Sequence, residues 1–348
     1  MRRLFALTGG LTIVHVALMA IPVHDVGDGS PAAYANGPRV GIVFDVGGRG
    51  DKSFNDGAWA GAERAERDLS AQARFIEPGD GSDREAGLRL LASDKQDLVI
   101  GVGFIFTDDL MTLANEYPDV RFAGVDLALR TNANGDVLPL PKNLAALKFR
   151  EEEGAFLVGA LAALAGGSKK VGFVGGMDIP LIHKFEDGYR QGVREVCPDC
   201  VVIAQYAGAT PEAFRNPSKG KELALSQYQA GVNVIFHASG STGLGVFEAA
   251  RTENKLAIGV DADQWAEAPG HVLTSMTKGV DAAVYDTVLR VKDGEFQGGV
   301  YSFGLKEAGV GYVYDEHNAA LIPDEVHARI EALRQKIIDG TIRVEVER

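Results

Sequence analysis

Short runs of β-branched and apolar residues recur along most of this chain, separated by amphipathic segments. The runs end at Gly, Asp or Pro, and most of them lead into a segment with helical spacing. Strands that are apolar throughout and alternate with helices are typical of parallel sheets covered on both faces, so the alternation predicts an α/β fold. The predicted strands are VGIVFD (40–45), ARFIE (73–77), QDLVIGVG (96–103), VRFAGVD (120–126), AALKF (145–149), KVGFVGG (170–176), VVIAQY (201–206), VNVIFHA (232–238) and LAIGVD (256–261).

This number of strands is too large for one open sheet, and 348 residues are enough for about two domains. Residues 130–142 interrupt the alternation with Asn, Gly and Pro. A helix over Glu151–Ala165, with acidic residues in its first turn where the helix dipole favours them, then opens the second half. We therefore predict two lobes. The first comprises residues 38–148 and about 277–305, and the second comprises 149–276 and about 306–348.

The N-terminus has the pattern of a secretory leader. Arg2 and Arg3 precede a mostly apolar stretch that ends at Val23, and Ala33-Tyr34-Ala35 forms a small-residue cleavage site. The alternative is a transmembrane anchor, because about 20 apolar residues are enough to span a bilayer. The helix breakers in the stretch favour a cleavable signal peptide over residues 1–35. With no Cys near the leader, we expect a periplasmic protein that is not lipid-anchored.

The charge balance excludes some classes of partner. The chain has 35 Lys and Arg against 48 Asp and Glu, a net charge of −13 that removal of the leader leaves unchanged. An acidic surface repels nucleic acid and anionic membranes, so neither is expected as a partner.

The two cysteines form the motif Cys197-Pro-Asp-Cys200 between a predicted helix and a predicted strand. A redox motif needs C-x-x-C at a helix N-terminus, whereas this one follows the helix. A structural zinc site needs four ligands, and no second pair accompanies these cysteines. In an exported protein the spacing is compatible with a short local disulfide.

No motif for catalysis or for cofactor binding is complete. The glycine-rich segment 47–53 has Asp51 where a phosphate-binding loop needs Gly, and Gly101 and Gly103 lack the third glycine of a dinucleotide-binding fingerprint. A nucleophile elbow would need Gly at position 239, which is Ser. The histidines are scattered without metal-ligand spacing. We therefore predict no catalytic residue, no metal and no cofactor.

Polar residues that directly follow the strands are the best candidates for a site, because ligands of open α/β sheets bind outside the carboxyl ends of the strands. In the segment from Asp45 to Trp59, Phe54 and Asn55 suit a planar polar ligand, since an aromatic face stacks on a heterocycle and an amide both donates and accepts. The alternative interpretation is structural: Ser53 caps a helix, and Phe54 and Trp59 pack into the core.

Several of these segments together resemble the basic membrane protein family, in the same order from about Val40 to Gly311. The family consists of exported receptors for ABC importers. The resemblance implies the fold of type I periplasmic binding proteins, in which two α/β lobes joined by three crossovers close over a ligand, and characterised members bind purine nucleosides. The matching segments are DVGGRGDKSFNDGAWAG, GVGFIFTDDL, FAGVD, VGFVGGMDIPLIHKFEDGYRQG, NPSKGKELA, GVDADQ and LTSMTKGVD.

The resemblance implies a role for particular residues. Phe54 matches one of two aromatics that sandwich the base, and Phe214 is the candidate for the second, although the segment ATPEAFRNP departs from the family's spacing. Asp261 and Lys278 match a late carboxylate and lysine that can bind ribose hydroxyls. The ligand-binding residues expected are Asp45, Phe54, Asn55, Asp126, Phe214, Gly240, Asp261 and Lys278.

The function expected is therefore that of a monomeric periplasmic binding protein without enzymatic activity. It would capture a purine nucleoside between its lobes and deliver it to an ABC permease in the inner membrane. A site with several Asp and one Lys would disfavour nucleotides. Two alternatives stay open: the same fold with another ligand, such as a sugar or free base, and a nucleoside hydrolase.

Overall fold

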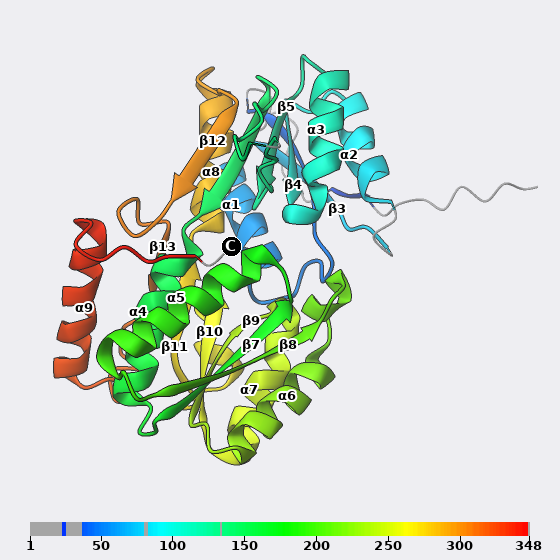
Figure 1. Cartoon of the computed structure of the whole chain (residues 1–348). Helices are drawn as coiled ribbons and strands as arrows, with labels where there is room; N and C mark the ends of the chain where they lie inside the picture. Colours follow the sequence, from blue (N-terminus) through cyan, green and yellow to red (C-terminus); the bar gives the residue numbers. More distant parts are fainter. Residues whose placement is uncertain (1–22, 26–36, 80–82, 133, 347–348) are drawn as a thin grey trace, which may run out of the picture.

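The computed structural model describes residues 23–25, 37–79, 83–132 and 134–346. It contains two sheets, drawn in the upper and lower halves of Figure 1, and each has helices on both faces. The predicted α/β fold is confirmed. The predicted signal peptide, residues 1–35, lies outside the described residues except for the short strand β1 (Val23–Asp25).

The first sheet has the strand order β1-β3-β2-β4-β5-β6-β12. Apart from β1, which pairs antiparallel with β3, its described strands run parallel. The strand β4 is buried along its whole length, as expected for a strand between two helical layers. The bounds are β2 (Arg39–Val43), β3 (Gln72–Ile76), β4 (Leu98–Val102), β5 (Arg121–Val125), β6 (Leu144–Phe149) and β12 (Gly299–Phe303).

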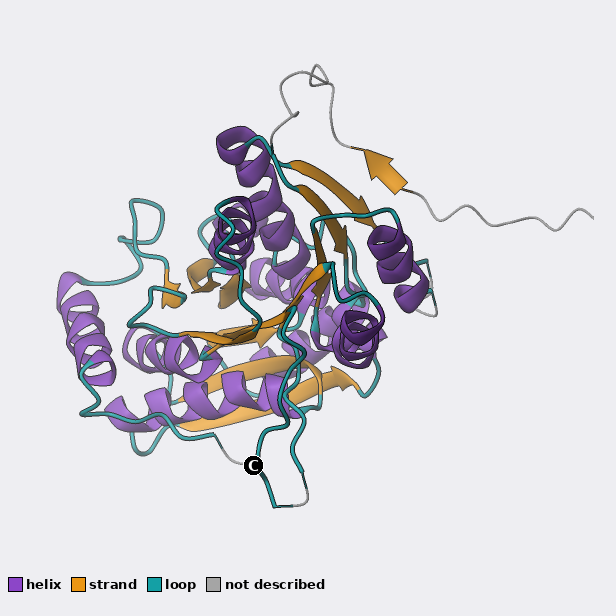
Figure 2. Cartoon of the chain, turned by 90° about the horizontal axis from the view of Figure 1, so that it is seen from above, coloured by secondary structure: helices purple, strands orange, loops and turns teal. Residues whose placement is uncertain are grey.

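Two pairs of helices cover this sheet, and Figure 2 shows them on its two faces from above. The helices α1 (Phe54–Leu69) and α8 (Val280–Lys292) pack together on one face. The other face carries α2 (Arg84–Ser93) and α3 (Thr107–Glu116), whose apolar side chains form a separate core cluster with the sheet.

The second sheet has the strand order β13-β11-β10-β9-β7-β8, and its described strands run parallel except β13. The helices α4 and α5 pack together on one face, and α6 and α7 on the other. The C-terminal helix α9 lies against α4 (Figure 1). The bounds are β7 (Lys170–Met177), β8 (Val201–Gly208), β9 (Val234–Ala238), β10 (Leu256–Asp261), β11 (Val272–Lys278), β13 (Val310–Tyr312), α4 (Glu151–Ala165), α5 (Pro180–Val196), α6 (Pro217–Gln229), α7 (Gly243–Glu253) and α9 (Asp324–Ile338).

We call the first sheet with its helices the first unit, and the second sheet with its helices the second unit. The chain passes between them after β6, after β11 and after β12. Hydrogen bonds join these crossovers to one another: the Arg150 amide donates to the Phe303 carbonyl over 2.9 Å, and the Gly279 amide donates to the Gly309 carbonyl over 2.8 Å. The crossing segments therefore form one hydrogen-bonded group.

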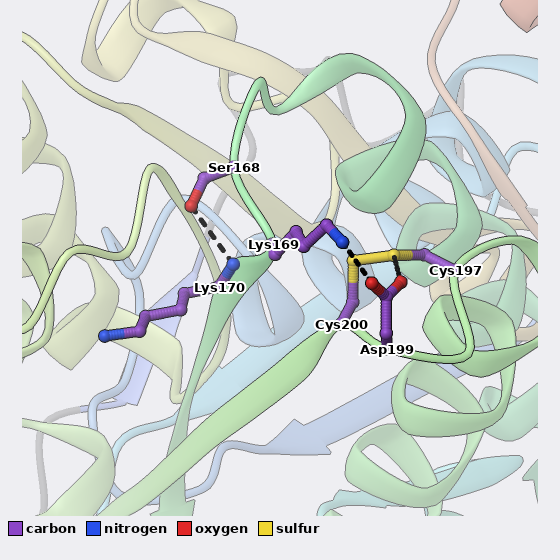
Figure 3. The surroundings of a disulfide bond; sticks show 6 residues. All are labelled: Ser168, Lys169, Lys170, Cys197, Asp199 and Cys200. Carbon is purple, nitrogen blue, oxygen red and sulfur yellow. Dashed lines mark hydrogen bonds and ion pairs between the residues drawn. A yellow bond between two sulfur atoms is a disulfide. The ribbon is translucent and has the colours of Figure 1, made fainter.

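Cys197 and Cys200 are bonded to each other, an arrangement with which the spacing of the motif was compatible. The bond closes the turn between α5 and β8, at the end of the second sheet where its strands begin (Figure 3). Asp199, between the two cysteines, forms an exposed ion pair with Lys169 just before β7.

Among the residues that the structure describes, no helix combines the length and the apolar character needed to cross a membrane.

Candidate functional site

A cleft of about 620 Å³ lies between the two units, at the carboxyl ends of both sets of parallel strands. All of the residues proposed from the sequence as ligand contacts line it. They are Asp45, Phe54, Asn55, Asp126, Phe214, Gly240, Asp261 and Lys278.

The loop between β2 and α1 is organised by Asp51, whose role the sequence did not indicate. The Asp51 carboxylate accepts hydrogen bonds from the backbone amides of Ser53, Asn55 and Asp56 over 3.0, 2.8 and 3.1 Å. It therefore satisfies amides at the first turn of α1, which have no partner inside the helix. Ser53 occupies the N-cap position, but its side chain makes no capping hydrogen bond.

The Asn55 side chain forms two hydrogen bonds within this loop. Its Oδ1 accepts from the Asp45 amide over 3.1 Å, and its Nδ2 donates to the Asp51 carboxylate over 3.0 Å. Asn55 is buried, so these bonds fix its orientation. Its amide holds Asp45 in place at the edge of the cleft, with one donor and one lone pair left for a ligand.

The two aromatic rings proposed to hold the ligand come from different units. Phe54 is the first residue of α1, and Phe214 ends the short helix η2 (Pro211–Phe214). A Cβ at Gly176 would lie 2.2 Å from the Phe214 ring, so the ring lies directly over the backbone of β7. The structural alternative holds for Trp59, which is buried and packs at 5.0 Å against Phe75, and in part for Phe54, which packs against the core while it also lines the cleft.

Lys278 lies in the middle of a buried group of charges where the two units meet. Its Nζ lies 2.6 Å from Asp126 Oδ2 and 3.0 Å from Glu151 Oε1, and Glu151 also pairs with Lys184. Burial alone would lower the pKa of Lys278, but Asp126, Glu151 and Asp261 raise it above its ordinary value. Lys278 therefore stays an ammonium ion that links the end of β11 in the second unit to the end of β5 in the first.

Asp126 and Asp261 occupy the same position in their strands, directly after β5 and at the end of β10. Their φ angles are 59° and 67°, in the left-handed region that residues other than Gly, Asn and Asp rarely adopt. Strained backbone of this kind persists where the surrounding structure holds it, and it is common at ligand sites. Both carboxylates reach the cleft, and one oxygen of Asp126 has no hydrogen-bond partner in the described structure.

Several carboxyl groups of the cleft are poised to change protonation near neutral pH. Burial raises the pKa of Asp45 to about 7, against the opposing hydrogen bond from the Val46 amide. Burial likewise raises the pKa of Asp261 to about 6, although Lys278 and the hydroxyl of Ser53 oppose the change. The cleft therefore holds protonated and ionised carboxyls together at pH 6–7.

The sequence also missed Glu151, Phe185 and Ser239. Glu151 is buried beside Lys278, although its place in the first turn of a helix suggested only a favourable interaction with the helix dipole. Phe185 and Ser239 line the cleft. Phe185 belongs to the quoted segment VGFVGGMDIPLIHKFEDGYRQG, so the resemblance marked its surroundings but not the residue itself.

Ser239 and His237 are the pair closest to the nucleophile and base that a hydrolase would need. Ser239 Oγ lies 3.4 Å from His237 Nδ1, while His237 Nε2 lies 3.1 Å from Gln264 Oε1. Burial lowers the pKa of His237 to about 4, so the imidazole is neutral and poorly suited to take a proton.

Comparison with known proteins agrees with this architecture. Residues 39–348 match the profile of the Bmp family, described as ABC transporter substrate-binding protein PnrA-like. An uncharacterised lipoprotein of Pyrococcus abyssi is 37% identical over 317 residues, 87% of this chain and 76% of that protein. Basic membrane protein A of Borreliella burgdorferi is 32% identical over 311 residues, 88% of this chain and 87% of that protein.

A solved structure extends the agreement to the fold. The crystal structure of an ABC transporter solute-binding protein from Aeropyrum pernix K1 superposes with a TM-score of 0.80 at 32% identity, covering 89% of this chain and 94% of that one. The predicted two-lobed fold of periplasmic binding proteins is therefore confirmed. The family description and this structure both concern substrate-binding proteins, whose partners are a ligand and an ABC permease.

The names of the related proteins correct the expected localisation. Similar proteins of Pyrococcus abyssi, Pyrococcus horikoshii and Pyrococcus furiosus are named lipoproteins. The prediction of a periplasmic protein that is not lipid-anchored is therefore wrong. The prediction rested only on the lack of Cys near the leader.

The matched profile spans most of the chain, and the relatives named above exceed 30% identity. This chain belongs to the Bmp family of PnrA-like ABC transporter substrate-binding proteins.

Proposed function

We propose that this protein binds a purine nucleoside in the cleft between its two units and delivers it to an ABC permease, without catalysing a reaction. The observation that carries the proposal is the combination of two phenyl rings from opposite units with a carboxylate and an ammonium group in one cleft. A nucleoside presents a flat heterocycle and vicinal hydroxyls, and this set of side chains matches both parts.

Phe54 and Phe214 would hold the base. Aromatic faces stack on heterocycles, and each ring contributes apolar area that binding removes from water. Asn55 holds the backbone of Asp45 at the same edge, and the second oxygen of the Asp45 carboxyl, beyond the one that accepts from the Val46 amide, would face the polar rim of the base. Because this carboxyl has a pKa of about 7, it can donate or accept a hydrogen bond near neutral pH.

Asp261 and Lys278 would bind the ribose. A carboxylate accepts hydrogen bonds from vicinal hydroxyls, and an ammonium group donates to their oxygens. The cleft also holds Asp45, Asp51 and Asp126, so its carboxyls outnumber its ammonium group. Above pH 7, where Asp45 and Asp261 are ionised, a phosphate would be repelled there, and we expect a nucleoside to bind more tightly than its nucleotide.

Closure would couple binding to transport. The groups that contact the ligand come from both units, so they surround it together only when the units are closed. A ligand that binds the closed arrangement better shifts the population toward it. The permease would then bind the closed form, in which the cleft is occupied.

Titration calorimetry tests the ligand class. The protein, freed of ligand by unfolding and refolding, is titrated with guanosine, adenosine, uridine, adenine, ribose and adenosine monophosphate. We expect the purine nucleosides to bind most tightly and the monophosphate at least about tenfold more weakly than adenosine. Tightest binding of ribose or of the free base would support the sugar or base alternative instead.

A single variant tests the proposed ribose contact. Asp261→Asn should weaken the binding of guanosine more than the binding of 2′,3′-dideoxyguanosine, because only the first offers the hydroxyls that the carboxylate accepts. Equal losses for both compounds would show that Asp261 does not contact the hydroxyls.

A product assay separates binding from hydrolysis. The protein is incubated with a molar excess of each nucleoside, and free base is measured by chromatography over several hours. Binding without turnover is expected. Release of many equivalents of base, abolished in Ser239→Ala, would identify the protein as a hydrolase that uses the pair Ser239 and His237.

A further inference from the structure

Gln264 joins the two units from a position outside the cleft. It follows β10 in the second unit, is 2% exposed, and its Nε2 donates to the Lys52 carbonyl of the first unit over 3.0 Å. We infer that Gln264 is a positioning residue that holds the two units closed and thereby sets the affinity for ligand without touching it. This inference rests on the proposed function, in which ligand binds between closing units.

The orientation of the Gln264 amide is determined by its neighbours in the second unit. Its Oε1 accepts from the Val260 amide over 2.8 Å and faces His237 Nε2 at 3.1 Å. His237 is fully buried and, as a neutral ring, must carry its proton on Nε2 to make this contact. With Oε1 fixed by these donors, Nε2 can only point toward the first unit.

The second unit also supports Gln264 through its backbone. The backbone N–H of Gln264 donates to Ser275 Oγ over 3.0 Å, and this bond anchors the turn after β10 to β11. The side chain therefore projects from a rigid base, and little conformational entropy is lost when it donates to the first unit.

On the first unit, the acceptor lies in a segment that is also held in a defined conformation. Lys52 has a φ of 55°, and the carboxylate of Asp51 binds the amides that follow it. The next residue, Ser53, donates its hydroxyl to Asp261 Oδ2 over 2.5 Å. These two adjacent hydrogen bonds between the units, from Gln264 to Lys52 and from Ser53 to Asp261, are called the latch below.

Gln264 acts on ligand only through closure, whereas Asp261, the acceptor of the other latch bond, itself lines the cleft. Gln264, Lys52 and Ser53 are not among the residues that line the cleft. If the latch holds a fraction of the ligand-free protein closed, the apparent dissociation constant is the intrinsic constant divided by that fraction. Loss of the bond from Gln264 to Lys52 would reduce the closed fraction and weaken binding, although every group that contacts ligand would be intact.

The experiment combines Gln264→Met with a matched control. Methionine keeps the volume but loses both polar atoms. Gln227→Met is the control, because Gln227 is equally buried and donates to the Phe173 carbonyl over 2.9 Å, entirely within the second unit. Small-angle X-ray scattering measures the radius of gyration of each ligand-free protein, and calorimetry measures the dissociation constant for guanosine.

We expect ligand-free Gln264→Met to have a larger radius of gyration than the wild type and to return to the wild-type value with saturating guanosine. Its dissociation constant should rise about tenfold, as expected for the loss of a buried hydrogen bond. Gln227→Met should have a lower unfolding midpoint but an unchanged radius and affinity. A purely structural role for Gln264 would give the same result as this control and would overturn the inference.

Two further arms keep the test decisive. If Gln264→Met does not fold, Ser53→Ala removes the other hydrogen bond of the latch and should give the same increase in radius. The radius is the readout for this variant, because Asp261 itself lines the cleft. An unchanged radius in Ser53→Ala would then overturn the inference. If the wild type binds no nucleoside, the proposed function fails, and the radii of the ligand-free proteins still decide whether the latch closes the units.

Discussion

The charged side chains at the two ends of the second sheet differ in how far they are exposed to solvent. At the cleft end, the pair Lys278 and Asp126 has side chains only 2% and 4% exposed. At the opposite end, the pair Lys169 and Asp199 is 72% and 64% exposed and lies beside the Cys197–Cys200 disulfide (Figure 3). The cleft end carries costly buried charge, and the far end carries solvated charge and a covalent bond. The charges at the two ends therefore differ in how strongly each depends on its partner.

Breaking the ion pair at each end gives the largest expected contrast. Lys278→Met leaves Asp126 and Glu151 buried without their shared cation, and should lower the free energy of unfolding by about 3–5 kcal/mol. Lys169→Met removes a solvated partner and should cost no more than about 1 kcal/mol. Urea unfolding of both variants measures the difference. Equal losses would show that the cleft charges are not energetically distinct.

Removing the disulfide tests whether the far end of the sheet affects ligand binding at the cleft end. The double variant Cys197→Ser with Cys200→Ser frees a short loop, and should lower the free energy of unfolding by about 2 kcal/mol through the entropy of the unfolded chain. Affinity for guanosine should be unchanged, because the bond lies at the end of the sheet away from the cleft. A loss of affinity in calorimetry would show that the two ends are coupled.

The pH dependence of stability should differ in sign between the two ends. The pKa values of Asp45 and Asp261, about 7 and about 6, exceed the ordinary carboxyl value, so the folded protein binds these protons more tightly than the unfolded chain. Their contribution is present at low pH and is lost as pH rises through the folded pKa. Each carboxyl can lower the free energy of unfolding by at most about 1.4 kcal/mol per pH unit, from about pH 4 to 7 for Asp45 and from about pH 4 to 6 for Asp261.

Asp45→Asn should remove its share of this slope, as measured by urea unfolding at pH 5, 6 and 7. Asp199 is the comparison, because its hydrogen bond with Lys169 lowers its pKa, and its contribution is therefore lost as pH falls. Asp199→Asn should leave the slope between pH 5 and 7 as it is in the wild type. A wild-type slope in Asp45→Asn would contradict the assignment of a raised pKa to that residue.

The smallest expected effects concern the aromatic rings. Phe54→Ala and Phe214→Ala should each weaken guanosine binding by at least about 1 kcal/mol, from lost stacking and burial. Phe54→Tyr keeps the aromatic face and should retain most of the affinity. Calorimetry that finds wild-type affinity in both alanine variants would remove the two-ring arrangement from the proposal.

The part of the site that the sequence predicted has a common physical basis. Asp45, Asp126 and Asp261 directly follow or end predicted strands, and the carboxyl ends of parallel strands meet at one edge of a sheet. The disulfide was also within reach, because its cysteines are separated by only two residues. Local patterns and one topological rule are enough for such features.

The remaining features depend on contacts between segments far apart in the chain. The bond between Ser53 and Asp261 joins residues 208 positions apart, and the bond between Gln264 and Lys52 joins residues 212 positions apart. The local sequence around Glu151 is that of an ordinary acidic residue in the first turn of a helix, and it does not indicate that Glu151 pairs with Lys278. No periodicity encodes how the units sit on one another, so these pairings required the structure.

The left-handed backbone at Asp126 and Asp261 limits which amino acids these two positions can accept. Asn, Asp and Gly enter that conformation readily, whereas most other residues meet steric repulsion there. A library randomised at both positions and selected for folding alone should therefore return this small set, before any requirement for ligand is applied. The backbone thus restricts the amino acids allowed at these two strand ends. A change of ligand specificity would therefore require substitutions mainly at other positions that line the cleft.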